Sequence, residues 1–219
     1  MKSDALLEQV LDSPELPFAI DRLQAVLEGE RPLRERFYEE ITEDGKVEFI
    51  NGKVVVQAPA KLKHIEVGGR LYLLLRTYVT RKKMGLVTYE KALVCLKRND
   101  YEPDIAFFGL EKAQQFTAEQ FKFPPPDWIC EILSKSTEKT DRGTKFADYA
   151  LHGVGEYWIV DPEREQIEIY SIDRDTYKVN AIVKAGTIRS EIISGFEIPV
   201  SAIFDDDQTD NALRALLVG

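Results

Sequence analysis

The sequence has few cysteines, no long hydrophobic run and no leader-like start, and each absence limits what the protein can be. Two of its 219 residues are cysteines, Cys95 and Cys130, and they form neither a CxxC motif nor a Cys/His metal spacing. Both stand within apolar runs, so we expect small core residues rather than metal ligands. No basic and apolar leader opens the chain, and no apolar stretch approaches the roughly 18 residues of a membrane span. We therefore expect a cytoplasmic protein with no membrane partner.

A net positive charge is also absent. The formal net charge of -9 argues against a protein that coats nucleic acid nonspecifically, because such binding depends on Lys and Arg that neutralise phosphates. Residues 51–100 nevertheless contain 11 Lys or Arg and three acids, so this stretch carries +8 and the remainder -17. One face of the protein could therefore be basic. Alternatively, Arg81, Lys82 and Lys83 would suit a helix C-terminus, where the helix dipole favours cations.

The remaining composition, with 44% hydrophobic and 31% charged residues, is that of an ordinary globular protein. The length suits one main domain, since single domains commonly run to about 200 residues. The hydrophobic spacing predicts a helical N-terminal extension at 1–36, a main domain at 37–204 and a short C-terminal helix at 205–219. The sequence contains no internal repeat.

Two short helices are expected in the N-terminal extension. Its apolar residues recur at helical spacing in two pieces, which Pro14 and Pro17 separate. Gly29 and Pro32 are expected to end the second piece, because glycine and proline are poor residues for a helix interior.

In the main domain, hydrophobic periodicity predicts strands and helices. Two strands at 46–50 and 53–57 flank Asn51-Gly52, the strongest short-range signal for a type I′ hairpin turn. Amphipathic helices are expected at 64–82 and 141–152. The other predicted strands are β-rich runs at 86–89, 92–96, 105–108, 128–133, 156–160, 166–171 and 177–183.

Two acids interrupt strands that are otherwise apolar. Asp104 stands at the start of the run 105–108, and Glu131 lies inside the run 128–133. Buried carboxylates are rare without a partner, because desolvation of the charge is costly. If the two strands are neighbours, both carboxylates could bind one Mg²⁺ ion, a hard cation that favours carboxylates, water and phosphate. A structural salt bridge to either acid is the alternative.

The helix expected after Glu131 places Asp141, Lys145 and Tyr149 on one face, because they are spaced four residues apart. By themselves, Asp141 and Lys145 would form an ordinary surface ion pair. The helix follows the strand that contains Glu131, however, and could fold back over the end of that strand. Lys145 would then orient an attacking water molecule and stabilise charge on a phosphodiester transition state.

Several short motifs occur in order between residues 36 and 203. They are 47–55 (VEFINGKVV), 102–106 (EPDIA), 128–134 (WICEILS), 136–137 (ST), Asp141, Lys145, Tyr149 and 153–162 (GVGEYWIVDP). Each motif is weak by itself, but together they match a family in both order and spacing. The sequence resembles the Uma-type restriction endonuclease family, a branch of the PD-(D/E)XK nuclease superfamily that was long known as a domain of unknown function.

The resemblance implies an α/β (α+β) fold with a restriction-endonuclease-like core, in which helices flank a mixed central β-sheet. It also implies that Asp104 and Glu131 bind the metal and that Glu48 is an additional acid of the site. The short motif departs from the superfamily in its third position, because Leu133 stands where the superfamily has lysine. The resemblance places that lysine on the following helix, at Lys145.

Other polar residues are candidates for substrate contacts. His64 opens the long helix, where the family also has a histidine, although a histidine at a helix start is commonly a cap or a satisfied polar group. Ser134 and Thr137 could bind a phosphate, but capping the next helix is the simpler explanation. Asp141 is a further candidate on the substrate side.

The leading hypothesis is a DNA endonuclease that depends on Mg²⁺ or Mn²⁺, with the basic stretch 53–98 facing the DNA backbone. No recognition helix or zinc finger indicates a DNA preference. The alternatives are a noncatalytic module that binds nucleic acid or protein, and a metal-dependent hydrolase of another substrate. Cleavage of both DNA strands requires two active sites, which predicts a homodimer. Its contact would use the N-terminal extension and the C-terminal residues Leu213, Leu216 and Leu217.

Overall fold

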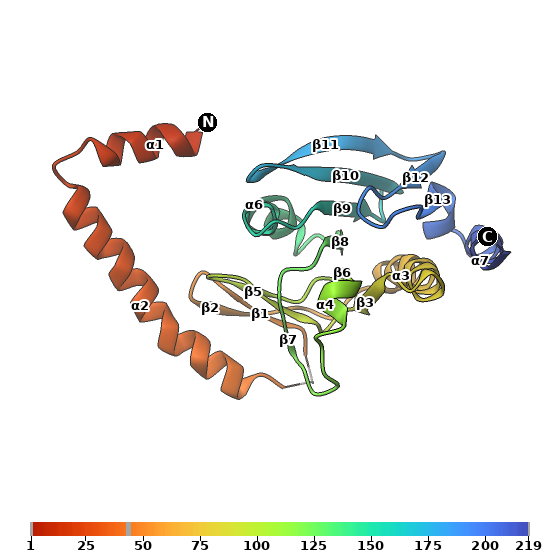
Figure 1. Cartoon of the computed structure of the whole chain (residues 1–219), viewed down its shortest axis with the longest axis horizontal. Coiled ribbons are helices and arrows are strands. Elements are labelled where there is room, and N and C mark those ends of the chain that lie inside the picture. Colours follow the sequence, from red (N-terminus) through yellow and green to blue (C-terminus); the bar gives the residue numbers. More distant parts are fainter. Residues whose placement is uncertain (1, 43–44, 219) are drawn as a thin grey trace.

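Helices flank two main β-sheets in the protein, and two further helices form an arm at its N-terminal end (Figure 1). The computed structural model describes residues 2–42 and 45–218. The larger sheet is mixed, as predicted. The smaller sheet contains the predicted hairpin and a strand from the predicted run 92–96, but its separation from the larger sheet was not predicted. Over the described ranges, none of the helices combines the length and the apolar character that crossing a membrane requires.

The arm consists of helix α1 (Lys2–Leu11) and helix α2 (Leu16–Glu40) (Figure 1). Pro14 lies in the turn that joins them, as predicted. Pro17 lies in the first turn of α2, where the backbone N–H that proline lacks would have no intrahelical acceptor. The prolines therefore separate the two helices without interrupting either of them.

Helix α2 is longer than predicted, because neither Gly29 nor Pro32 ends it. A proline in a helix interior removes one backbone donor and costs about 3 kcal/mol. Contacts beyond Pro32 offset that cost: the Arg34 guanidinium donates to Asp100 Oδ2 at 2.7 Å, and Phe37 is buried. Tertiary packing thus overrides the local helix-breaking signal, and the predicted helix end was wrong.

The smaller sheet begins with the predicted hairpin. Strands β1 (Val47–Ile50) and β2 (Lys53–Val56) pair antiparallel, and φ is 50° at Asn51 and 77° at Gly52, as a type I′ turn requires. Glu48 is fully buried on β1. The order β2-β1-β5-β4-β7 is completed by β5 (Asp100–Tyr101), β4 (Leu93–Cys95) and β7 (Lys122–Phe123).

The larger sheet has the strand order β11-β10-β9-β8-β6-β3. Strands β8 and β9 are parallel, and the other neighbours are antiparallel. Ile105 of β6 lies opposite Cys130 of β8, so these two strands are adjacent. The strands are β3 (Gly85–Tyr89), β6 (Ile105–Gly109), β8 (Trp128–Ile132), β9 (Glu156–Asp161), β10 (Gln166–Asp173) and β11 (Thr176–Val183).

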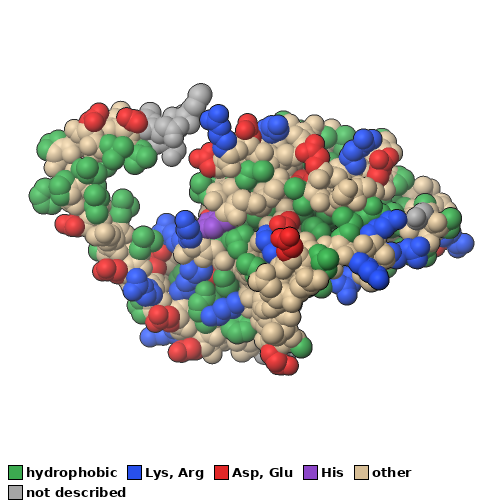
Figure 2. Space-filling model, in the orientation of Figure 1, with side chains coloured by type: hydrophobic (Ala, Val, Ile, Leu, Met, Phe, Trp, Pro, Cys, Tyr) green, Lys and Arg blue, Asp and Glu red, His purple; other side chains and the backbone are tan. Residues whose placement is uncertain are grey.

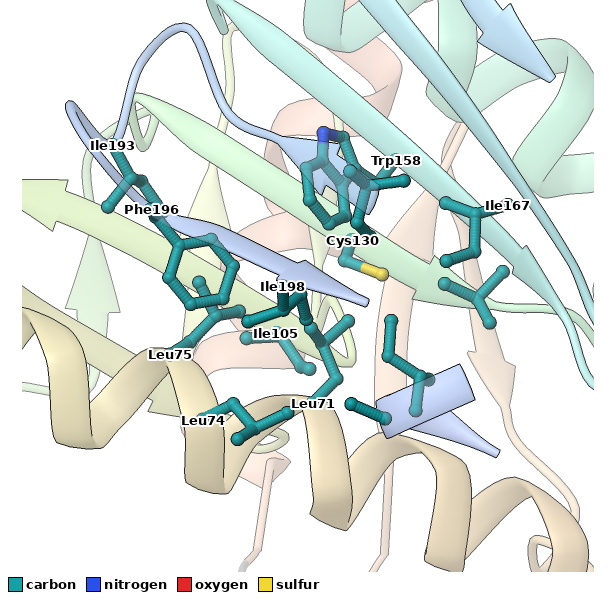
Figure 3. Packing of buried hydrophobic residues seen from close by; sticks show 14 of the residues in the cluster. Leu71, Leu74, Leu75, Ile105, Cys130, Trp158, Ile167, Ile193, Phe196 and Ile198 are labelled. Atoms are coloured by element: carbon teal, nitrogen blue, oxygen red, sulfur yellow. The ribbon is translucent and has the colours of Figure 1, made fainter. Parts of the chain in front are cut away.

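Helix α3 (Leu62–Lys82) packs on one face of the larger sheet, and helix α7 (Asp206–Val218) packs against α3 (Figure 1). Buried hydrophobic residues of α3 and of the larger sheet form one cluster. Cys130 belongs to it, as predicted for a core cysteine. The α3 side chains that point into this cluster include Leu71, Leu74 and Leu75 (Figure 3).

The C-terminal helix contributes to this core rather than to a free surface. Leu213 and Leu216 of α7 pack against the cluster, and Leu217 is 45% exposed. Of the three leucines that we predicted for a dimer contact, Leu213 and Leu216 are therefore engaged within their own chain.

The opposite face of the larger sheet is covered by the helical segment that follows β8. This segment consists of α5 (Glu138–Thr140), a π-helical turn (Asp141–Lys145) and α6 (Phe146–Leu151), so it begins three residues earlier than predicted. The π-helical turn had no signal in the sequence, and such turns often occur at functional sites. Because side chains alternate along a strand, Glu131 points to this face while Cys130 points to α3.

The remaining elements complete the chain between and after these segments. They are α4 (Leu110–Ala113), the short antiparallel pair β12 (Thr187–Arg189) and β13 (Glu197–Pro199), and a 3₁₀ helix (Val200–Ile203).

Candidate active site

Asp104 and Glu131 lie on neighbouring strands and are both buried. Asp104 directly precedes β6, and its Oδ2 atom accepts a hydrogen bond of 2.7 Å from the backbone N–H of Ile132 in β8. Glu131 Oε2 in turn accepts from the backbone N–H of Asp104 at 3.4 Å. The exposed fractions of the two acids are 3% and 2%. The condition on which the metal hypothesis depended, adjacency of the two strands, is therefore met.

Lys145 lies among buried carboxylates. Its Nζ atom is 2.8 Å from Glu48 Oε1, 3.0 Å from Glu131 Oε1 and 3.5 Å from Asp141 Oδ1. The Tyr149 hydroxyl donates to the same Glu131 Oε1 atom at 2.9 Å. The π-helical turn and α6 thus direct these side chains toward the sheet, as predicted. The alternative of a surface ion pair between Asp141 and Lys145 was wrong, because both are only 1% exposed.

Glu48 reaches the site from the smaller sheet. Its Oε1 atom accepts from Lys145 Nζ and, at 3.1 Å, from the backbone N–H of Glu102. Its Oε2 atom accepts from Gln57 Nε2 at 2.8 Å. Both oxygens are therefore engaged by protein donors.

Asp104 is contacted from its other side by Lys46 and His64. Lys46 Nζ lies 2.5 Å from Asp104 Oδ1, and His64 Nε2 lies 3.5 Å from Asp104 Oδ2. His64 thus faces the acids instead of capping its helix. Oxygen or nitrogen atoms of His64, Glu90 and Asp104 also lie within 4.8 Å of one another, close enough to hold one cation together.

The charged groups of this cluster do not balance. Four carboxylates and two ammonium groups lie together, those of Glu48, Asp104, Glu131, Asp141, Lys46 and Lys145. With all six ionised, the cluster would hold two more negative than positive charges. Because uncompensated buried charge is costly, a divalent cation fits this site both in charge and in its preference for oxygen ligands.

The pKa values of the two central acids, Asp104 and Glu131, shift in opposite directions. Burial, although opposed by the Lys145 ammonium, raises the pKa of Glu131 to about 8. Burial also acts on Asp104, but the Lys46 ammonium and His64 outweigh it and hold the pKa of Asp104 below its usual range. Near neutral pH, Asp104 is therefore ionised, whereas Glu131 favours its protonated form until a cation compensates its charge.

The acids open onto a cleft with a volume of about 910 Å³, which Lys145, His64 and Ser134 also line. Ser134 Oγ accepts from the backbone N–H of Thr137 at 3.2 Å, so it stabilises the turn before α5. The predicted cap was wrong, because the N-cap residue of α5 is Thr137 and no side chain of the described residues caps the helix there. The loop nevertheless forms part of the cleft wall.

The basic stretch is distributed over several surfaces. Lys61 and Lys63 line the cleft. Arg98 pairs with Glu30 of α2 at 2.6 Å, and Arg70 pairs with Asp206 of α7 at 2.7 Å. The basic side chains of this stretch therefore do not form a single DNA-binding face.

Comparisons with known proteins identify the family of the chain. Residues 34–201 match the family model described as Uma2, putative restriction endonuclease. The chain belongs to the Uma2 family. This match confirms the resemblance on which the predicted fold and site were partly based. None of the curated proteins compared matches the chain.

A solved structure shows the same fold as this Uma2 family member. It is described as a putative nuclease belonging to DUF820 from Anabaena variabilis ATCC 29413. The sequences are 17% identical, the alignment covers 82% of this chain and 97% of that chain, and the TM-score is 0.67. The predicted fold, a restriction-endonuclease-like core in which helices flank a mixed central β-sheet, is thereby confirmed.

The Uma2 motifs did not identify Lys46, Gln57 or Glu90 as parts of the site. The hairpin register carried a signal for the first two. Glu48 of β1 lies opposite Val55 of β2, so the two side chains point to the same side of the hairpin. Gln57, two residues after Val55, points to that side as well. Lys46, two residues before Glu48, also lies on that side. Glu90 follows β3 and had no comparable signal.

Proposed function

We propose that this protein is a Mg²⁺-dependent endonuclease that hydrolyses DNA phosphodiester bonds. The observation that carries the proposal is the pair of buried acids, Asp104 and Glu131, which neighbouring strands hold at the base of a cleft beside Lys145. Membership in the Uma2 family and the nuclease-like fold support a nuclease activity independently. A cytoplasmic location and Mn²⁺ as a substitute metal belong to the same proposal.

Asp104 Oδ1 and Glu131 Oε2 are the oxygens that we assign to the metal. Glu131 Oε1 already accepts from Lys145 and Tyr149, and Asp104 Oδ2 accepts from Ile132, whereas Glu131 Oε2 accepts a longer hydrogen bond, of 3.4 Å, from the Asp104 N–H. When bound, a divalent cation supplies positive charge that stabilises a phosphodiester transition state and lowers the pKa of water.

Glu48 has a different role in this proposal from the one implied by the resemblance. It was expected to be an additional metal ligand, but its oxygens accept from Lys145, Glu102 and Gln57. We assign it to holding the Lys145 ammonium in place. Lys145 borders the cleft beside Glu131, where it would orient the attacking water and stabilise negative charge.

The DNA backbone would meet basic side chains that line the cleft. Besides Lys46 and Lys145, these are Lys61, Lys63, Lys135 and Arg164, of which Lys63 pairs with Glu163 and Arg164 with Asp161. Contacts of this kind position a duplex through its phosphates and do not select a sequence.

The proposal predicts metal-dependent cutting of DNA by the purified protein. Supercoiled, linear and single-stranded DNA are incubated with Mg²⁺, with Mn²⁺ or with a chelator, and RNA of the same length serves as a substrate control. We expect nicked and linear products with either metal and none with the chelator. Tight DNA binding without any cutting would overturn the proposal in favour of a noncatalytic binding module.

The arm is the contact that we propose for a homodimer, which would supply the second active site for cleavage of both strands. Hydrophobic side chains lie exposed along α2 (Figure 2), among them Phe18 at 70%, Leu23 at 65% and Leu27 at 52%. Large exposed apolar surfaces of this kind are typical of association sites.

The homodimer can be tested by light scattering during size exclusion at micromolar concentration. We expect twice the mass of the chain for the natural protein and the mass of one chain when Phe18→Glu and Leu23→Glu are combined. Leu151→Glu is the matched control, because Leu151 is 63% exposed and lies outside the arm. A natural protein that elutes only as a monomer would contradict this assembly.

A further inference from the structure

Lys46 contacts the oxygen that the proposed function assigns to the metal. Its ammonium lies at Asp104 Oδ1, while the other oxygen of Asp104 already accepts from the Ile132 N–H and faces His64. A divalent cation and the Lys46 ammonium would therefore compete for one carboxylate oxygen.

Lys46 is held much less firmly than Lys145. The ammonium of Lys145 contacts three carboxylates, and its side chain is 2% exposed. The side chain of Lys46 is 20% exposed and lines the cleft, and among the described residues its ion pair is with Asp104 alone. Its backbone is fixed, since the Lys46 carbonyl accepts from the Gln57 N–H at 2.9 Å. The side chain can therefore leave Asp104 while the hairpin stays in place.

The Lys46 ammonium also compensates the negative charge of Asp104 when no metal is bound. Asp104 is almost completely buried, and an ionised carboxylate without a cation would carry a large desolvation cost. Lys46 compensates that charge with one positive charge, whereas the four carboxylates and two ammonium groups of the cluster would, with all six ionised, have an excess of two negative charges. A divalent cation can therefore replace Lys46 and compensate more of the charge.

From these contacts we infer that Lys46 is a built-in occupant of the metal position, which a divalent cation must displace from Asp104 in order to bind. This inference rests on the proposed metal site. Apparent metal affinity is then lowered by the fraction of the protein in which Lys46 occupies Asp104. Binding of the metal releases the ammonium into the cleft.

The test is calorimetric titration of Mn²⁺ into the natural protein and into Lys46→Met. We expect the dissociation constant to fall by about tenfold or more in the variant, because the competitor is gone. Lys91→Met is the matched control, since Lys91 is also a nearby lysine but pairs with Glu102, at 3.9 Å, rather than with Asp104. It removes the same charge, and we expect a change of less than about twofold, as for a partly exposed pair.

Thermal unfolding provides a second measurement that does not depend on the calorimetry. Lys46→Met should unfold at a lower temperature than the natural protein without metal, and Mn²⁺ should raise its unfolding temperature by more. Lys46→Gln replaces the methionine variant if the latter does not fold. Equal or weaker Mn²⁺ binding by the folded variant would overturn the inference. Because the readout is metal binding, a protein that binds Mn²⁺ but cuts no DNA would overturn only the proposed function.

Discussion

Replacing Glu131 with glutamine is expected to lower metal-dependent DNA cleavage by about 10²- to 10³-fold, the usual cost of losing one preorganised electrostatic group in an active site. Glutamine keeps the size of the side chain and can still accept from Lys145 and Tyr149 through its amide oxygen. It lacks the negative charge that would compensate the charge of the cation. The measurement is the initial rate of plasmid nicking at saturating Mg²⁺.

The matched control for this substitution is Glu156→Gln. Glu156 is also a buried glutamate of the larger sheet, but it accepts from Ser190 and from the backbone N–H groups of Glu191 and Ile192. We expect this variant to cut DNA at the natural rate. The assignment of Glu131 to the metal would be wrong if Glu131→Gln cut equally fast, or if Mn²⁺ bound to it with unchanged affinity.

Replacing Lys145 with methionine should destabilise the protein by about 3–5 kcal/mol, the range measured when one partner of a buried ion pair is removed. The variant leaves Glu48, Glu131 and Asp141 buried without the ammonium that contacts all three. Urea-induced unfolding, followed by circular dichroism, measures the free energy of unfolding. For comparison, Lys112→Met removes a half-exposed partner of Asp127 and should cost less than about 1 kcal/mol.

The pH dependence of the Lys145→Met defect identifies its cause. Burial already raises the pKa values of Glu131 and Asp141, and without the ammonium they rise further above their unfolded values, so the folded state binds more protons than the unfolded state. Its stability therefore falls as the pH rises, and the defect should be smaller at pH 5 than at pH 8. Adding Glu131→Gln should recover part of the lost stability, because it removes one of the unpaired charges. A defect that is equal at both pH values would instead indicate a loss of packing.

Local patterns accounted for most of the secondary structure. The Asn51-Gly52 turn, the apolar spacing of α3 and the β-rich runs each depend on neighbours in the chain, and all were confirmed. The end of α2 was not predicted correctly, because the contact that carries the helix past Pro32 comes from Asp100, which lies far away in the sequence. The π-helical turn at 141–145 had no local signal either.

The sequence by itself determined which acids had to find partners. Asp104 and Glu131 interrupt apolar strands, and burial of a carboxylate without compensation is too costly to occur without a reason. The motifs also determined the family, which the match over residues 34–201 confirmed. The roles of the site residues stay predictions that the cleavage and binding experiments test.

Only the tertiary structure decided how the charges are paired. It placed Glu48 against Lys145, and it brought Lys46 of the hairpin to Asp104 of the larger sheet, 58 residues along the chain. Periodicity indicates the side of its own strand to which a side chain points. It does not indicate which residues of another sheet will lie next to that side chain. Electrostatic energy depends on the distance through space between charged groups, and that distance is set only when the two sheets pack.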